Sequence, residues 1–264
     1  MSLKKCIGIA SYLPEENELL IREKRSERLT NLFLQLEELW PEIDILIIAQ
    51  NWQDYQPPKI SNKIIIDKYD KPLTIVGARN TLRNKFLELD YDYIIMLDDD
   101  AHIFVESPEI AAAYMQAIDN NPDKFCFIHD PFNKHWHTMD DYIPAPLNLC
   151  AISRFIYAKE EIPSAVLEKN EALEDDIFAV LLHVKYVELE FLPPKGIYCD
   201  HYKNGQYAMA FKNPGKIWPS TWYTLESSNL VTIVLNTMTV LNYIVRNKEL
   251  PDLEKLKENS RWIC

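Results

Sequence analysis

The sequence predicts an α/β fold with a mostly parallel central sheet, and three observations lead to it. Strand-like and helix-like segments alternate through the first half of the chain. The strand-like segments are apolar on both faces, the pattern of strands that helices cover on both sides. Three consecutive aspartates, Asp98 to Asp100, directly follow one of these segments. In doubly wound sheets, ligands bind beyond the carboxyl ends of the strands.

The first half of the chain is predicted with little ambiguity. The helix expected at residues 20–40 has leucines and aromatic residues three and four positions apart, and Pro41 ends it. A second helix, expected at residues 73–89, has the same periodicity. The strands expected in this half are at residues 5–11, 43–50, 63–67 and 92–97. This β-α-β-β-α-β order favours a largely parallel sheet.

The second half is less regular. We expect a helix at residues 107–121, capped by Ser107 with Pro108 at its first position. A second helix, expected at residues 173–184, opens on acidic residues. The further strands expected are at residues 124–130, 147–155, 185–192 and 195–201. Residues 131–146, between the strands at 124–130 and 147–155, are expected to form a loop rich in aromatic residues and histidines. The aromatic residues would either stack on a bound acceptor sugar or pack the loop on the core.

The last part of the chain predicts a helical extension. Residues 229–246 form an apolar helix with one narrow polar stripe, which is a poor membrane span. Such a helix packs inside its own fold or against a partner, so a homodimer through this helix stays open. We therefore expect two regions, a main domain at residues 1–220 and a C-terminal helical extension at residues 221–264.

Composition limits the partners and the compartment. The 264 residues carry a formal net charge of −12, with 28 basic and 40 acidic side chains. Nucleic acid is therefore not an expected partner, because binding to it requires clustered Lys and Arg. The five cysteines have no zinc-ligand or redox-motif spacing, and the first residues do not form a signal peptide. Both features predict a cytoplasmic protein without a membrane span.

The three aspartates predict a divalent metal. Asp98 and Asp100 lie two residues apart, so in an extended segment their carboxylates project to the same side. Hard cations such as Mg²⁺ or Mn²⁺ prefer oxygen ligands and are often shared with substrate phosphates. The metal would offset the repulsion between the acids and would also bind a diphosphate. The alternative is a solvated acidic turn.

These segments resemble a family. The strand followed by LDDDAHIF, with GARNTLRNKFLEL before it, resembles the DxD region of the metal-dependent GT-A glycosyltransferases. LEDDIF, at residues 173–178, resembles the acidic segment of inverting members such as the β-1,4-galactosyltransferases. IYCDHYKNG resembles the segment with the late histidine that completes their metal site. The three segments occur in the family's order. The resemblance implies a GT-A fold, which is Rossmann-like, with a C-terminal helical segment.

The resemblance also implies roles for individual residues. Asp98, Asp100 and His201 would form the metal site, with Asp98 on the ribose or on the metal's water shell. Asp98, Asp99, Arg79 and Ser11 would bind the nucleotide sugar. Asp175 would be the general base, with Glu174 or Asp176 positioning the acceptor.

Each role has a structural alternative. Acids that open a helix also cap it and interact favourably with its dipole, which applies to residues 174–176. Arg79 has the alternative of pairing with a nearby carboxylate. His201 has the alternative of being an ordinary histidine at the end of a strand.

The predicted function is that of a metal-dependent hexosyltransferase. It would move a sugar from a nucleoside-diphosphate sugar, with UDP as the expected nucleotide, to a glycan, protein or small-molecule acceptor, with inversion at the anomeric carbon. One alternative is a sugar nucleotidyltransferase, which normally has a glycine-rich phosphate loop after the first strand; IASYLPEENE has no glycine there. The other alternative is a non-catalytic protein that binds nucleotide sugars or glycans.

Overall fold

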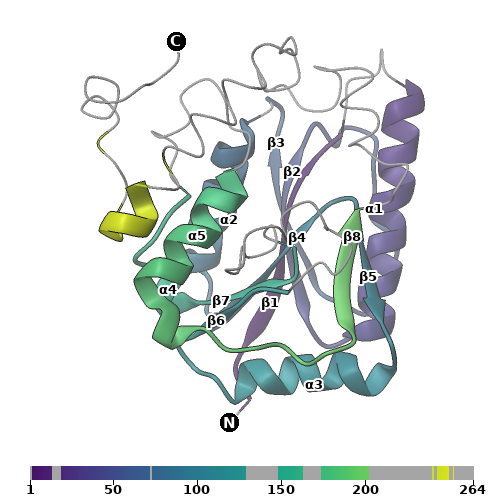
Figure 1. Cartoon of the computed structure of the whole chain (residues 1–264). Helices are drawn as coiled ribbons and strands as arrows, with labels where there is room; N and C mark the ends of the chain where they lie inside the picture. Colours follow the sequence, from purple (N-terminus) through teal and green to yellow (C-terminus); the bar gives the residue numbers. More distant parts are fainter. Residues whose placement is uncertain are drawn as a thin grey trace.

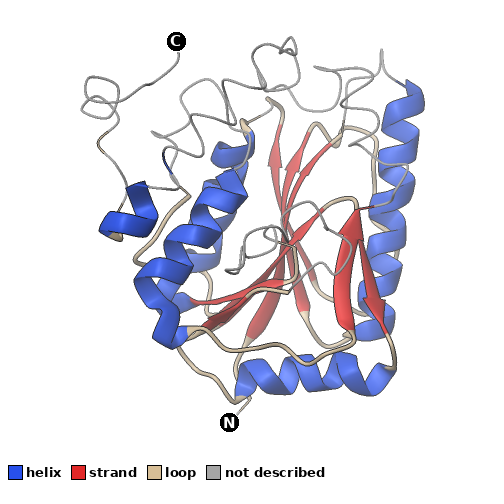
Figure 2. Cartoon of the chain, viewed as in Figure 1, coloured by secondary structure: helices blue, strands red, loops and turns tan. Residues whose placement is uncertain are grey.

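The computed structural model describes residues 2–13, 19–71, 73–128, 148–162, 174–201, 240, 243–249 and 252. Figures 1 and 2 show a sheet between two layers of helices. The strands are β1 Lys5–Tyr12, β2 Asp44–Gln50, β3 Ile64–Tyr69, β4 Tyr93–Asp98, β5 Ala101–Val105, β6 Phe125–Cys126, β7 Cys150–Ser153 and β8 Ile197–His201. The helices are α1 Leu19–Leu39, α2 Ile75–Glu88, α3 Pro108–Asp119, α4 Arg154–Tyr157, α5 Glu174–Tyr186 and the 3₁₀ helix η2 Val187–Leu189.

The main sheet has six strands in the order β3-β2-β1-β4-β7-β6. β1 pairs in parallel with β2 on one side and with β4 on the other, and β2 pairs in parallel with β3. The strand order therefore reverses direction at β1, which makes the carboxyl ends of β1 and β4 the topological switch point. The predicted mixed α/β fold with a mostly parallel sheet is confirmed.

Two antiparallel pairings bring later parts of the chain to this edge. β7 runs antiparallel to β4, so the start of β7 lies beside the end of β4. β5 follows the turn that Asp99 and Asp100 form after β4, here called the acidic turn. It pairs antiparallel with β8 in a separate two-stranded sheet. Figure 1 shows this pair beside α1 and above α3. The end of β8 therefore returns to the place where β5 begins.

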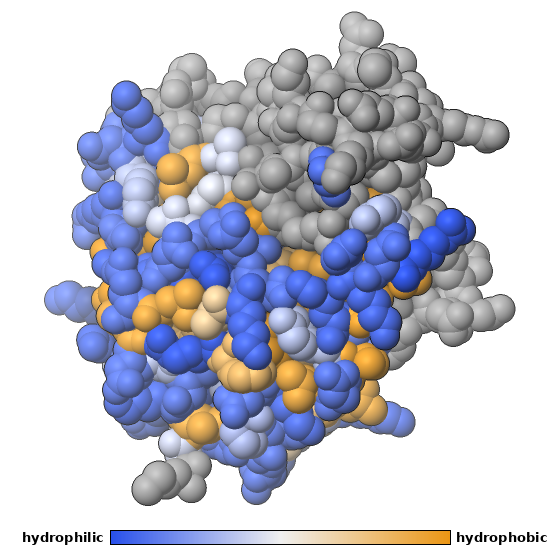
Figure 3. All heavy atoms as spheres, turned by 90° about the vertical axis from the view of Figure 1, so that its left-hand side faces the viewer, coloured by the Kyte–Doolittle hydropathy of each residue, from blue (hydrophilic) through white to orange (hydrophobic). Residues whose placement is uncertain are grey.

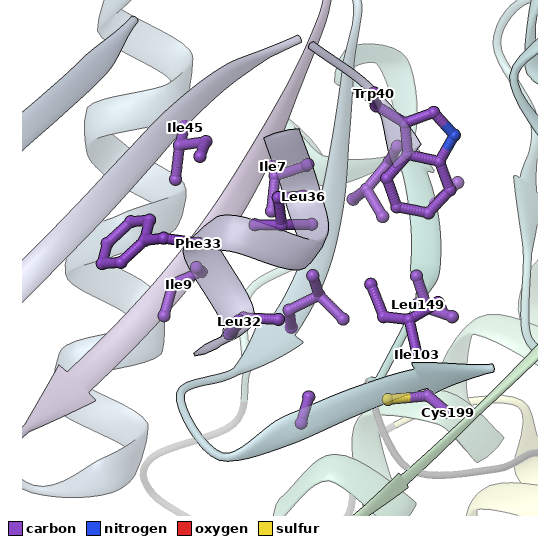
Figure 4. Packing of buried hydrophobic residues seen from close by; sticks show 14 of the residues in the cluster. Ile7, Ile9, Leu32, Phe33, Leu36, Trp40, Ile45, Ile103, Leu149 and Cys199 are labelled. Atoms are coloured by element: carbon purple, nitrogen blue, oxygen red, sulfur yellow. The ribbon is translucent and has the colours of Figure 1, made fainter. Parts of the chain in front are cut away.

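One core cluster fills the space between the main sheet, α1, α3 and the β5–β8 pair. Phe33 and Leu36 of α1 pack toward Ile7 and Ile9 of β1, as Figure 4 shows. Ile103 of β5 and Cys199 of β8 belong to the same cluster. The regular spacing of apolar residues in α1 thus places that face of the helix on the sheet.

The second core cluster lies on the other face of the sheet, under α2, α4 and α5. Leu82 and Phe86 of α2 meet Ile94 of β4 in this cluster, and Phe178 of α5 lies against Tyr157 of α4. On the outer surface of this side, apolar atoms form separate patches between hydrophilic ones (Figure 3). The helices on this side therefore point their apolar faces mainly inward.

The structure corrects two of the predicted elements. Residues 185–192 were predicted as a strand, but α5 continues to Tyr186, η2 follows, and only Glu190 makes an isolated bridge, to Phe125. The alternation of polar and apolar residues that suggested a strand here belongs to the end of α5 and the 3₁₀ helix after it. β5 was not predicted, because the aspartates before it suggested a loop.

Several predictions fall on residues that the structure does not describe. These are the loop at residues 131–146, most of the helix predicted at 229–246, and the division into two regions at residue 220. Four cysteines are buried and free within the described residues, namely Cys6, Cys126, Cys150 and Cys199. Within the described residues, no helix combines the length and the apolar character needed to cross a membrane.

Candidate functional site at the carboxyl edge of the sheet

The acidic turn lies at the topological switch point. Asp98 is the last residue of β4 and pairs in register with Ala10 of β1. Asp99 and Asp100 form the turn that follows, and β5 starts at Ala101. The predicted position of the three acids at the ligand edge of the sheet is therefore confirmed by the topology.

Asp98 is held by two side chains from other parts of the chain. Arg79 of α2 donates from Nη2 to Asp98 Oδ1 at 2.8 Å. Asn148 donates from Nδ2 to Asp98 Oδ2 at 3.0 Å, and its Oδ1 accepts the backbone N–H of Asp98 at 2.8 Å. Each oxygen of the carboxylate thus accepts at least one hydrogen bond, while 28% of the Asp98 side chain stays exposed.

Asp99 points into the protein. Arg25 of α1 donates from Nη2 to its Oδ1 at 2.5 Å. Ser11 Oγ, at 2.8 Å, and the backbone N–H of Tyr12, at 3.1 Å, donate to its Oδ2. The Asp99 side chain is 4% exposed and that of Arg25 is 2% exposed. Burial raises the pKa of Asp99, Arg25 opposes this shift, and neighbouring Asp100 adds to it.

Ser11 connects this network to the neighbouring strand. Trp52 donates from Nε1 to Ser11 Oγ at 3.1 Å, and Gln50 donates from Nε2 to Ser11 O at 3.3 Å. Gln50 Oε1 accepts the backbone N–H of Leu73, just before α2, at 2.6 Å. Ser11, predicted to bind the nucleotide sugar, therefore lies at the switch point, and its hydroxyl hydrogen-bonds to Asp99 and Trp52 within the protein.

Asp100 and His201 are neighbours along the backbone ladder. Asp100 is buried, with 6% of its surface exposed. The next residue, Ala101, pairs in register with His201 at the end of β8. The antiparallel pairing of β5 and β8 therefore brings the backbone of His201 beside the acidic turn, although the side chain of His201 lies outside the described part. His102 follows at the next position and packs edge-on against Phe104.

The second acidic segment begins a helix. α5 starts at Glu174, so Glu174, Asp175 and Asp176 occupy its first turn. Figure 1 shows α5 running from the side where β1, β2 and β3 end toward the side where they begin. The acids are thus on the side of the molecule that carries the acidic turn, and the described part leaves out their side chains.

Two of the three acids form an ion pair with an arginine. Asp98 pairs with Arg79 and Asp99 pairs with Arg25. Part of the repulsion among the three carboxylates is therefore relieved within the protein. No group of three His, Cys, Asp or Glu side chains that could hold a metal occurs in the part of the chain that the structure describes.

Sequence reasoning missed two residues of this site. Arg25 stands among other charged residues in IREKRSER, where nothing distinguishes a buried arginine from a solvated one. Asn148 is 50 residues from its partner Asp98 and was predicted to be part of a strand. The polar residue at the start of an apolar segment, LNLCAIS, was the available signal.

Solved structures resemble this chain, although no family model and no curated protein matches its sequence. A fragment of TarS from S. aureus, residues 1–349, in complex with UDP-GlcNAc is 12% identical over 96% of this chain and 69% of that chain, with a TM-score of 0.51. The fold is of the GT-A type. At this identity the likeness concerns the fold and does not by itself assign an activity.

Two further solved structures are more distant. The same TarS fragment in another crystal structure has a TM-score of 0.43 at 13% identity, over 67% of this chain and 54% of that chain. A197 from STIV has a TM-score of 0.42 at 13% identity, over 76% of this chain and 86% of its own. The present chain thus covers 54% and 69% of the TarS fragment in these two crystal structures.

Proposed function

We propose that this chain is a glycosyltransferase that uses a nucleoside-diphosphate sugar and a divalent metal. The observation that carries the proposal is the acidic turn at the switch point of a GT-A fold, with the end of β8 paired beside it. TarS, which has a similar fold, has been crystallised with UDP-GlcNAc and with UDP. UDP is therefore the first nucleotide to test.

The proposed metal ligands are Asp100 and His201. A carboxylate and an imidazole suit Mn²⁺, and Mg²⁺ is the alternative if oxygen ligands dominate. When bound, the metal would stabilise the charge of the departing nucleoside diphosphate as a Lewis acid. A site with few protein ligands leaves coordination positions for the phosphate oxygens.

Asp98 has a different proposed role. Its ion pair with Arg79 offsets its charge, and its partial exposure leaves acceptor capacity on the outer side of the carboxylate. This suits a contact with a ribose hydroxyl or with the metal's water shell. Arg79 would then serve the donor by holding Asp98.

The proposed general base is Asp175, in the first turn of α5. It would take the proton of the acceptor hydroxyl as that hydroxyl attacks the anomeric carbon, with Glu174 or Asp176 positioning the acceptor. This mechanism inverts the anomeric configuration. NMR of the product tests it: retention of configuration, or full turnover by Asp175→Asn, would exclude Asp175 as the base.

A thermal-unfolding screen tests the proposal. UDP, GDP, CMP and ADP are each added with Mn²⁺ or with a chelator to the wild type and to Asp100→Asn. A ligand at about a hundred times its dissociation constant should stabilise the fold by about 2.7 kcal/mol. We expect UDP to stabilise the wild type only with Mn²⁺, and Asp100→Asn to lose this effect.

The matched control is Asp90→Asn. Asp90 is an exposed acid at the opposite end of β4, where it pairs with Lys4. This variant should respond to UDP and Mn²⁺ as the wild type does. Stabilisation of the wild type by no nucleotide, or an equal response of Asp100→Asn, would argue against the proposed site. Release of UDP from a UDP-sugar then separates an enzyme from a non-catalytic binding protein.

A further inference from the structure

We infer that Asn148 is a positioning residue, which fixes the carboxylate of Asp98 for the donor nucleotide. This inference rests on the proposed function and names a residue that the resemblance to known families does not supply. The carboxamide of Asn148 contacts Asp98 twice, through the backbone N–H at 2.8 Å and through Oδ2 at 3.0 Å.

Two contacts to the same residue define an orientation. The N–H of Asp98 fixes the plane of the carboxamide, and the amide nitrogen then fixes one oxygen of the carboxylate. Arg79 of α2 fixes the other oxygen, at 2.8 Å. With a donor on each oxygen, rotation of the carboxylate would break at least one charge-assisted hydrogen bond.

The backbone around Asn148 supports this placement. Leu149 has a positive φ of 55°, which is uncommon for a residue other than glycine, and its N–H donates to Met96 O at 2.8 Å. This turn precedes β7 and points the buried Asn148 side chain, which is 6% exposed, at the end of β4. Strained backbone is found where the surrounding structure holds a side chain in a required place.

Removal of the Asn148 carboxamide tests the inference. Asn148→Ala and Asn148→Leu remove both contacts to Asp98 and leave the charges of Asp98 and Arg79 in place. If Asn148 positions Asp98, both variants, measured at a temperature where they are folded, should bind UDP with Mn²⁺ about tenfold or more weakly, the effect of losing a hydrogen bond to a charged group. If Asn148 only supports the fold, the variants should lose thermal stability but bind UDP as tightly as the wild type.

Asn62→Ala is the matched control. Asn62 is buried and donates to Trp40 O and Ile43 O before β2 and β3, at the opposite edge of the sheet. It should lower thermal stability without changing the affinity for UDP.

The outcomes separate the inference from the proposed function. Binding by the wild type and equally tight binding by the Asn148 variants would overturn the inference and leave the function standing. Failure of the wild type itself to bind any nucleotide would overturn the function, and a positioning role at a ligand would fall with it. Weak binding of UDP with Mn²⁺ by folded Asn148→Ala and Asn148→Leu, together with unchanged binding by Asn62→Ala, supports the inference.

Discussion

At the residue scale, the acidic turn depends on a buried ion pair. Arg25 and Asp99 are both almost fully buried, and Ser11 and Tyr12 complete the partners of Asp99. Removing a charge from water is costly, and such pairs are maintained by their hydrogen bonds. The pair therefore ties α1 to the turn that carries the proposed metal ligand.

Loss of Arg25 should destabilise the protein strongly. Arg25→Met leaves Asp99 as a buried carboxylate without its cation, which typically costs about 3–5 kcal/mol. Urea unfolding of the variant and the wild type measures this loss. In Arg25→Met with Asp99→Asn, no buried charge is left uncompensated, so part of the loss should be regained. A loss below about 1 kcal/mol in the single variant would mean that Asp99 finds another partner or takes up a proton.

The three aspartates of the site were predictable from the sequence, whereas their hydrogen-bond partners were not. Asp98, Asp99 and Asp100 were predictable as a site because they follow an apolar strand, and that relation is local. Their partners are not local: Arg25 comes from α1 and Asn148 from the turn before β7. Hydrogen bonds across such separations depend on the sheet order, which residue spacing does not encode.

At the element scale, α2 packs closely on β1 through Gly8. A Cβ added to Gly8 would lie 2.5 Å from Ile94 Cδ1 and 3.2 Å from Leu82 Cδ2. A larger residue at position 8 would have to displace Ile94 of β4 or Leu82 of α2. The contact sets the depth at which α2, and with it Arg79, lies on the sheet.

Gly8→Ala should therefore destabilise the protein. Overpacking of a well-filled core typically costs about 1–3 kcal/mol. Gly77→Ala is the comparison, because the nearest atom to its added Cβ is Thr74 Oγ1 at 3.0 Å and alanine favours the helix. Denaturant midpoints of both variants measure the difference. Equal stability of the two variants would show that Ile94 moves aside without cost.

Gly196 has a similar role for β8. Its φ is +88°, and an added Cβ would lie 2.7 Å from both Glu106 Oε2 and Ile110 Cδ1. Gly196→Ala should cost about 1–3 kcal/mol through backbone strain and this contact. Because β8 ends at His201, the variant should also weaken the stabilisation by UDP with Mn²⁺. A calorimetric titration at a temperature where the variant is folded checks this, and unchanged affinity would contradict it.

Helices and strands with long apolar periodicities were predicted better than short ones. α1, α2 and β1 to β4 carry long apolar periodicities, and all were predicted within a few residues of their observed bounds. β5 was missed and residues 185–192 were assigned to a strand, because short segments alternate in polarity for several reasons. Their structure is decided by pairing with β8 and by the end of α5.

At the scale of the whole molecule, the two sheets differ in how they are protected. β1 and β4 lie inside the main sheet and are buried along almost their whole length. Within the described residues, β5 and β8 pair only with each other. A two-stranded pair is expected to open locally more easily than a central strand.

Hydrogen exchange should reveal this difference. Amides of β1 and β4 should exchange only through global unfolding, whereas those of β8 should exchange faster through local opening. Mass spectrometry of the exchanged protein measures both, and UDP with Mn²⁺ should slow exchange in β8 selectively. Equal protection of β1 and β8 without ligand would contradict the expectation.

The antiparallel pairing of β5 with β8 also bears on how the molecule acquires its site. Ala101 must find His201 across an intervening stretch that contains α3, β7 and α5. Contacts between positions so distant in sequence close large loops and form slowly. During synthesis, the acidic turn leaves the ribosome long before β8 does. We expect β1 to β4 to assemble first and ligand competence to appear late, once β8 has docked.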